Sequence, residues 1–193
     1  MPSNSYRIWR TTRAAVLDEM ADAQATVGGS ERGRRYATQQ LTRAYAVMLA
    51  AQFQGFCRDL HDDCVEHLLR VIGPPPTLRV MLETELIRGR QLDRGNAQPS
   101  SLGADFARLR IDLWPPLREH DADSVGWRAD LEALNDWRNA IVHEDFTSPR
   151  LGEIINLRLD HVRRWRRSCR RLARAIDEVT RQRLLVTTGV SPW

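Results

Sequence analysis

The residues of this chain best suited to chemistry lie in the run Arg138-Asn139-Ala140-Ile141-Val142-His143, inside a predicted amphipathic helix. At about 100° per residue, Arg138 falls in the middle of an apolar stripe that includes Leu131 and Leu134. A guanidinium held away from water without a partner costs several kcal/mol, so an anion should meet Arg138. The chemistry that this arginine offers is therefore anion binding, with a phosphate or a carboxylate as partner.

A polar stripe runs along another face of the same helix. Asp136, Asn139 and His143 fall within about 60° of one another when the chain is wound at about 100° per residue. A single histidine near a helix end commonly acts as a cap or interacts with the helix dipole, so His143 alone does not indicate catalysis. The stripe becomes informative only together with Arg138, which directly precedes Asn139.

Arginine supplies all 29 basic residues of the chain, and the net charge is +4 at pH 7. This charge favours an anionic partner, and a compositional bias is the alternative explanation for the arginines. The last predicted helix carries seven arginines and no acid between His161 and Ile176, opposite its apolar stripe. Such a face could track phosphates, or it could be a solvated helix surface. The candidate RNA-binding residues on it are Arg163, Arg167, Arg170 and Arg174.

Helices must position these residues, because apolar side chains recur at spacings of three and four and no segment shows the alternation of a strand. Glycine and proline runs mark the predicted ends, including Gly28-Gly29-Ser30, Gly73 to Pro76, and Pro115-Pro116 after the fourth helix. Ser148-Pro149 reads as a cap with proline in the first turn. The predicted helices span about 6–27, 36–72, 78–91, 101–114, 124–145 and 154–183. We therefore expect an all-α, single-domain bundle of five to seven helices.

The length of 193 residues suits one domain with its own core. We expect an N-terminal helix within 1–35 that packs on or precedes the core, a helical domain over 36–183 and a flexible tail over 184–193. The sequence contains neither a run of about 18 apolar residues nor the apolar core of a secretory signal. These absences predict no membrane association and a cytoplasmic location.

No metal or cofactor is expected. The three cysteines, Cys57, Cys64 and Cys169, form neither an even disulfide set nor a metal-ligand spacing, and we interpret them as small core residues. His61 and His67 lack the spacing of a zinc pair on a helix. We interpret their acid-rich segment as a charged helix face.

The segment from Leu134 to Glu144 resembles the signature of the HEPN superfamily, the higher eukaryote and prokaryote nucleotide-binding domains. That signature is an arginine, a polar residue, three variable residues and a histidine, and the chain matches it at Arg138, Asn139 and His143. Long helices before and after the motif helix also suit HEPN domains similar to those of ribonuclease-linked and abortive-infection systems. The resemblance covers roughly residues 36–183.

The resemblance implies a metal-independent endoribonuclease that acts as a homodimer, with the two motif helices forming a shared cleft. In this role His143 is a base or acid for cleavage by the RNA 2′-hydroxyl, because a neutral imidazole can take up a proton near physiological pH. Arg138 clamps the phosphate as its negative charge grows, and Asn139 is a positioning residue. The resemblance also suits a toxin or a phage-defence effector, with an antitoxin or a nucleotidyltransferase as partner.

A geometric difficulty accompanies this interpretation. Arg138 and His143 are about 140° apart around a regular helix and do not share a face. Three arrangements would bring them together: the helix ends near Val142 and frees His143, the long arginine reaches around, or residues of two chains combine in a dimer. The sequence leaves these three open.

Two rival hypotheses remain. In the first, the chain is a non-catalytic helical module whose motif supports a dimer interface or binds RNA or a nucleotide. In the second, the domain is purely structural, and a buried carboxylate such as Glu83 or Glu85 neutralises Arg138.

Overall fold

The computed structural model describes residues 1–27, 34–152 and 156–193 of the chain. These ranges contain helices and no strand, which confirms the predicted all-α class. The first helix is continuous through α1 (Asn4–Ile8), a π-helical turn η1 (Trp9–Arg13) and α2 (Ala14–Val27). Counted in this way, the described ranges hold eight α-helical segments, one more than the predicted upper limit.

The later elements follow in chain order. They are α3 (Arg34–Ile72), α4 (Pro76–Ile87), α5 (Gln91–Arg94), α6 (Pro99–Arg108), α7 (Trp114–His120), α8 (Ser124–His143), the 3-10 helix η2 (Pro149–Leu151) and α9 (Leu159–Thr188). In the described ranges, no helix is both long enough and apolar enough to span a bilayer.

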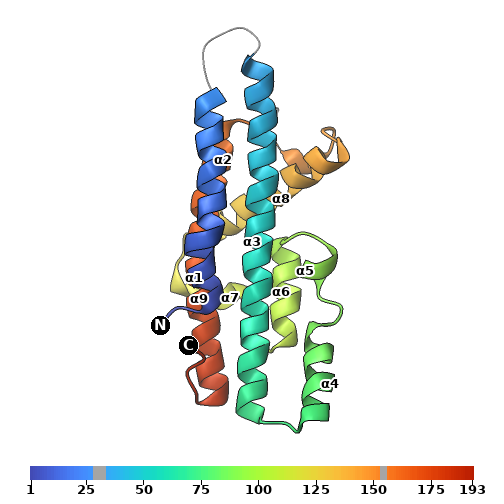
Figure 1. Ribbon diagram of the computed structural model, residues 1–193, viewed down its shortest axis with the longest axis vertical. Helices are drawn as coiled ribbons and strands as arrows, with labels where there is room; N and C mark the ends of the chain where they lie inside the picture. The colour runs from blue at the N-terminus through green and yellow to red at the C-terminus, as the bar shows by residue number, and fades with distance from the viewer. Residues whose placement is uncertain (28–33, 153–155) are drawn as a thin grey trace.

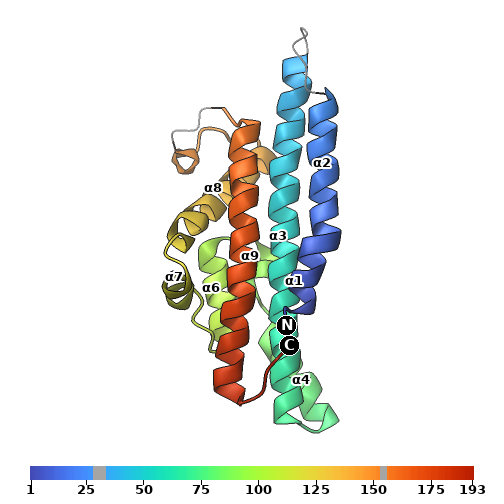
Figure 2. The same cartoon turned by 90° about the vertical axis from the view of Figure 1, so that its left-hand side faces the viewer.

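Three long helical segments form the frame of the molecule. The N-terminal segment, α3 and α9 run side by side along the long axis, and α4 to α8 cover the other side of α3 and α9 (Figures 1 and 2). Trp9, Phe53 and Phe56 form an aromatic cluster in the core, with ring centroids 5.7 to 6.0 Å apart. The core therefore includes residues of the segment 1–35 that was predicted to pack on or precede it.

Polar contacts fix the N-terminal segment against α3 and α9. The backbone N–H of Ser3 donates to the Asp177 carboxylate of α9 at 3.3 Å, and that of Ser5 donates to Asp63 of α3 at 3.1 Å. Further along, the guanidinium of Arg13 in η1 packs closely against Gly55 of α3. Its Nη2 forms an ion pair with Oδ2 of Asp59 at 2.7 Å. A Cβ at position 55 would collide with this guanidinium, so glycine is required for so close an approach.

The three cysteines lie in the core as predicted. Cys57, Cys64 and Cys169 are fully buried and free. Burial raises the pKa of all three thiols, so they remain protonated at neutral pH.

The prediction that Pro115-Pro116 closes the fourth helix is wrong. The fourth helix, α6, ends at Arg108, and Arg110 turns the chain with a φ of 59°. Both prolines lie in the first turn of α7. Proline is well tolerated there because the first turn of a helix leaves its N–H groups unpaired in any case.

Other helix ends were predicted more closely. Ser148 caps η2 with Pro149 in its first turn, as expected. The last helix begins at Leu159 and continues five residues beyond the predicted end at 183, with Leu184 buried. The predicted start at Ile154 and the predicted stop at Gly28-Gly29-Ser30 lie outside the described residues.

Candidate functional site

The motif residues lie in the last two turns of α8, which begins at Ser124 as predicted. The helix ends at His143 because Glu144 adopts the left-handed conformation with a φ of 55°. The chain then turns back, and the ring of Phe146 packs beside Trp137 with centroids 6.2 Å apart. His143 is thereby left at the exposed end of the helix.

The buried face of α8 rotates along the helix. Trp127 and Leu131 are the buried residues near its start, whereas Trp137 and Ala140, which lie on a different face by helix phase, are buried near its end. Val142 is 49% exposed and Arg138 is half-buried. The prediction of one straight apolar stripe centred on Arg138 is therefore wrong. The cause is the oblique course of α8, which begins against α7 and α9 and ends beyond α3 (Figures 1 and 2).

Arg138 reaches around the helix toward the polar stripe. Its Nη1 donates a hydrogen bond to Oδ1 of Asn139 at 3.2 Å. By helix phase Asn139 lies between Arg138 and His143, and His143 follows it by one turn on the same face. The contact ends at Asn139, so it does not by itself bring Arg138 to His143, and the three expected arrangements stay open. No hydrogen bond joins Arg138 to His143 among the described side chains.

The orientation of the Asn139 carboxamide follows from its partners. A guanidinium can only donate, so the atom facing Arg138 must be the carbonyl oxygen. The same oxygen accepts a second hydrogen bond from Nδ2 of Asn96. With Oδ1 occupied by two donors, the NH2 group of Asn139 has no hydrogen-bond partner among the described residues and can donate to a phosphate or to His143.

A short segment before α6 holds the motif face in place. Asn96 donates to Asn139, Gln98 donates to Asp136 at 2.9 Å, and the carbonyl of Ala97 between them accepts from Asn135 at 3.0 Å. We call residues 96–98 the strap. Its role was not predicted, because these residues fall between two predicted helices. The alternation of two amides around a small residue is the only signal that the sequence offers.

The strap also affects a carboxylate of the polar stripe. Burial raises the pKa of Asp136, and the hydrogen bond from Gln98 offsets part of this rise. On the other side of His143, the side-chain and backbone hydrogen bonds of Thr147 lower the pKa of Asp145, with a smaller contribution from the charge of His143. The imidazole of His143 therefore lies near the carboxylate of Asp145.

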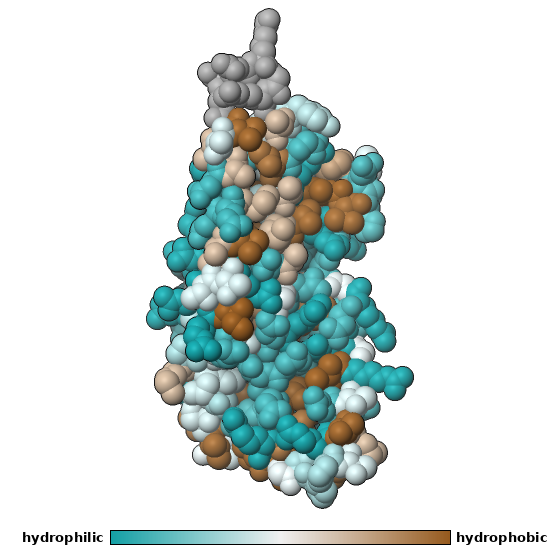
Figure 3. All heavy atoms as spheres, viewed as in Figure 1, coloured by the Kyte–Doolittle hydropathy of each residue, from teal (hydrophilic) through white to brown (hydrophobic). Residues whose placement is uncertain are grey.

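The site is open to solvent within one chain. Arg138, Asn139 and His143 line none of five pronounced hollows on the described surface. The exposed apolar side chains of Val142 and Phe146 lie beside the motif. Brown atoms gather accordingly where the end of α8 reaches the right-hand edge of the molecule (Figure 3).

A structural role for Arg138 through Glu83 or Glu85 finds no support. Both glutamates are exposed on α4, and neither forms an ion pair with Arg138. Arg138 has no ion pair with any carboxylate of the described ranges. Its positive charge is therefore not neutralised by a described side chain.

The candidate RNA-binding arginines lie on the exposed face of α9, away from the motif. Figure 1 shows the end of α8 on the right and α9 on the left, and Figure 2, which faces that left side, shows α9 in front. Arg163, Arg167, Arg170 and Arg174 are all exposed. Of the seven arginines between His161 and Ile176, Arg164 pairs with Asp130 at 3.0 Å and Arg166 pairs with Asp18. Sequence spacing alone missed these partners because they come from α8 and α2.

The described ranges contain no group of three or more histidine, cysteine or acidic side chains placed to hold a metal ion. The prediction that His61 and His67 belong to a charged helix face is wrong, since both are buried. His61 donates from Nε2 to the carbonyl of Asp105 at 3.2 Å and accepts at Nδ1 from Arg90 at 3.3 Å. Burial, assisted by the charge of Arg90, lowers the pKa of His61 to about 4. His61 is thus a neutral core residue.

Comparison with models of known protein families, with curated proteins and with solved structures finds no significant match to this chain.

Proposed function

We propose that this chain is a metal-independent endoribonuclease of the HEPN type. The observation that carries the proposal is the contact between Arg138 and Asn139, one turn before the exposed His143. It turns a cation that has no ion-pair partner among the described side chains toward a carboxamide, and an exposed imidazole follows one helical turn later. This set matches the needs of a phosphate diester under attack.

The reaction that we propose uses the RNA 2′-hydroxyl as nucleophile. His143 takes the proton of this hydroxyl. The 2′ oxygen then bonds to phosphorus, and the bond between phosphorus and the 5′ oxygen breaks. Arg138 binds the phosphate oxygens, whose negative charge is greatest in the transition state, and Asn139 orients the phosphate through its NH2 group. The departing 5′ oxygen takes a proton from a second acid, for which the same histidine of a second copy is suited. The products carry a 2′,3′-cyclic phosphate and a 5′-hydroxyl.

A homodimer would supply both the cleft and this second acid. Val142 and Phe146 give the end of α8 an exposed apolar surface beside the motif, which favours association through this end of the helix. The biological role that we infer is that of a cytoplasmic toxin or phage-defence effector, controlled by an antitoxin or a nucleotidyltransferase.

The test is cleavage of single-stranded RNA in the presence of EDTA. The wild-type protein should release products with 2′,3′-cyclic phosphate ends, and His143→Ala should lower the rate by at least about 100-fold because general acid–base catalysis is lost. His120→Ala is the matched control, since His120 is also an exposed histidine at the end of a helix. Full activity of His143→Ala would overturn the mechanism.

The alternative is a non-catalytic module that binds RNA or a nucleotide, or that dimerises. The openness of the motif within one chain favours it, because the three side chains line none of the five pronounced hollows on the described surface. RNA that is bound at the motif but never cut, with binding lost in Arg138→Ala, would support this function instead.

A further inference from the structure

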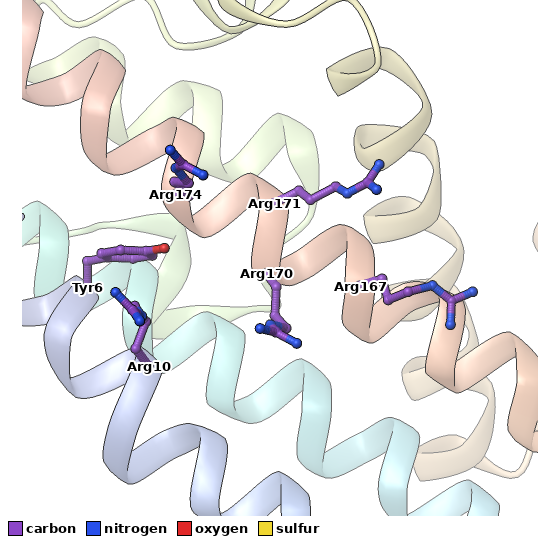
Figure 4. A pocket seen from close by; sticks show the side chains of 6 residues that line it. All are labelled: Tyr6, Arg10, Arg167, Arg170, Arg171 and Arg174. Carbon is purple, nitrogen blue, oxygen red and sulfur yellow. The ribbon is translucent and has the colours of Figure 1, made fainter.

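A hollow of about 630 Å³ lies between α9 and the N-terminal helical segment, far from the motif. Figure 4 shows Tyr6 and Arg10 of the N-terminal segment facing arginines of α9. We call this hollow the arginine groove. It is lined by Tyr6, Arg10, Arg167, Arg170, Arg171 and Arg174.

The cations of the arginine groove have no anionic partner in the described part of the chain. None of its five arginines forms an ion pair or a hydrogen bond with a described side chain, in contrast to Arg164 and Arg166 on the same helix. Arg171 instead lies over the ring of Trp127 at 5.6 Å. Bringing five unpaired guanidinium groups together is unfavourable, and a bound polyanion would remove this repulsion.

The groove continues along the helix. Arg163, Arg167, Arg170 and Arg174 fall within about 60° of one another and form a row about 16 Å long. Arg167 and Arg171 also line a neighbouring hollow of about 650 Å³, and Arg171 and Arg174 line another of about 500 Å³. A third hollow, of about 250 Å³, shares Tyr6, Arg10 and Arg170 with the groove. Acidic residues line all three of these neighbouring hollows, whereas the lining of the arginine groove includes none. A row of this length suits successive phosphates of a strand better than one phosphate group.

Tyr6 adds an aromatic surface to this row. Its half-buried ring packs edge-on against Phe56 in the core at 6.5 Å, which holds the ring in place. Aromatic rings beside a basic groove are the feature by which proteins stack unpaired bases, whereas the bases of a duplex are already stacked on each other. The combination of Tyr6 with the arginines therefore favours a single strand over a duplex.

We propose that the arginine groove binds single-stranded nucleic acid, with Arg10, Arg170 and Arg174 on the phosphates and Tyr6 stacked on a base. This site is separate from the motif and does not require that the chain cleave RNA. It also assigns a role to the N-terminal segment, which brings Tyr6 and Arg10 to the face of α9.

The experiment measures binding by fluorescence anisotropy. The probe is a labelled 2′-O-methyl oligouridine of about a dozen nucleotides, which has no free 2′-hydroxyl and therefore reports binding whether or not the protein is a ribonuclease. The groove variant is Arg170→Gln/Arg174→Gln. The control is Arg118→Gln/Arg183→Gln, which removes the same charge from exposed positions outside the groove.

The groove variant should bind at least about tenfold more weakly at 0.1 M salt, and the slope of log Kd against log salt should fall by about 1.4, since each lost phosphate contact contributes about 0.7. The control should change the affinity less than about twofold. Equal losses in both variants would overturn the proposal, because binding would then depend on net charge alone.

Two single variants test the N-terminal contribution. Arg10→Gln should weaken binding, whereas Arg7→Gln, an exposed arginine of α1 outside the groove, should not. Tyr6→Leu keeps apolar packing against Phe56 and should weaken binding of the oligonucleotide severalfold, but not of inorganic polyphosphate. Polyphosphate that competes as well as the oligonucleotide at equal phosphate concentration would reduce the site to a general polyanion surface and overturn the assignment to a nucleic acid strand.

Discussion

The carboxamide of Asn139 keeps the charge of Arg138 free while still orienting it. Its oxygen accepts hydrogen bonds from Arg138 and from Asn96, and it carries no net charge. A carboxylate in the same place would accept the same bonds, but it would neutralise the guanidinium. The difference between these two side chains therefore separates a positioned cation from an internal ion pair.

Asn139→Asp should lower the rate of RNA cleavage by about 10²- to 10³-fold, the effect of losing one preorganised charge contact to the transition state. The thermal unfolding midpoint should change little, because the hydrogen bonds persist. Asn4→Asp is the matched control, since Asn4 also accepts a hydrogen bond from an arginine, Arg7, on the distant helix α1. Unchanged cleavage by Asn139→Asp would contradict the role of Arg138 as phosphate clamp.

At the scale of elements, α6 and α7 meet closely at Gly103. The Nε1 of Trp114 in α7 donates to the carbonyl of Pro99 at the start of α6 at 2.9 Å, and a Cβ at position 103 would lie 2.9 Å from that nitrogen. Glycine is therefore needed at this point of α6. In α8, by contrast, a Cβ at Gly126 would meet nothing within 4 Å.

These two glycines give opposite predictions for one substitution. Gly103→Ala should lower the free energy of unfolding by about 1–3 kcal/mol, because Trp114 must move and lose its hydrogen bond. Gly126→Ala should raise it by about 0.5–1 kcal/mol, because alanine stabilises a helix where there is room. Urea unfolding measures both, and the same sign for the two variants would contradict this description of the packing between α6 and α7.

The helices themselves were largely predictable, because many of their ends depend on local residues such as Gly73, which follows α3 with a φ of 60°. The prolines at 115 and 116 misled the prediction, since proline can begin a helix as well as end one. The site was predictable only in part. The strap at 96–98 and the burial of His61 between Arg90 and the Asp105 carbonyl depend on contacts between residues far apart in the chain. No periodicity within one segment reports such pairings.

At the scale of the whole molecule, the motif and the arginine groove lie on opposite sides of the frame (Figures 1 and 2). A dimer formed through the ends of two α8 helices would leave both arginine grooves on its outer sides. A short RNA could then reach only one of the two kinds of site, whereas a long one could occupy both and gain from the higher effective concentration.

Val142→Glu should shift the protein from dimer to monomer in light scattering coupled to gel filtration. It places a charge on an exposed apolar residue beside the motif, where a dimer would have to bury it. Val125→Glu is the control, because Val125 is similarly exposed at the other end of α8. A wild-type protein that is monomeric at all concentrations, or a dimer that both variants retain, would contradict association through the end of α8.

The π-helical turn η1 has a further consequence for relatives of different length. Such a turn holds one residue more than a regular α-helix over the same stretch. A relative with one residue deleted within Trp9–Arg13 would return to regular α-helical winding, and the residues before the deletion would keep their facing relative to Leu17, because the π turn absorbs the extra residue. Tyr6 would then stay in the arginine groove while α2 kept its contacts. Relatives that differ in length by one residue at this turn would thus share the groove.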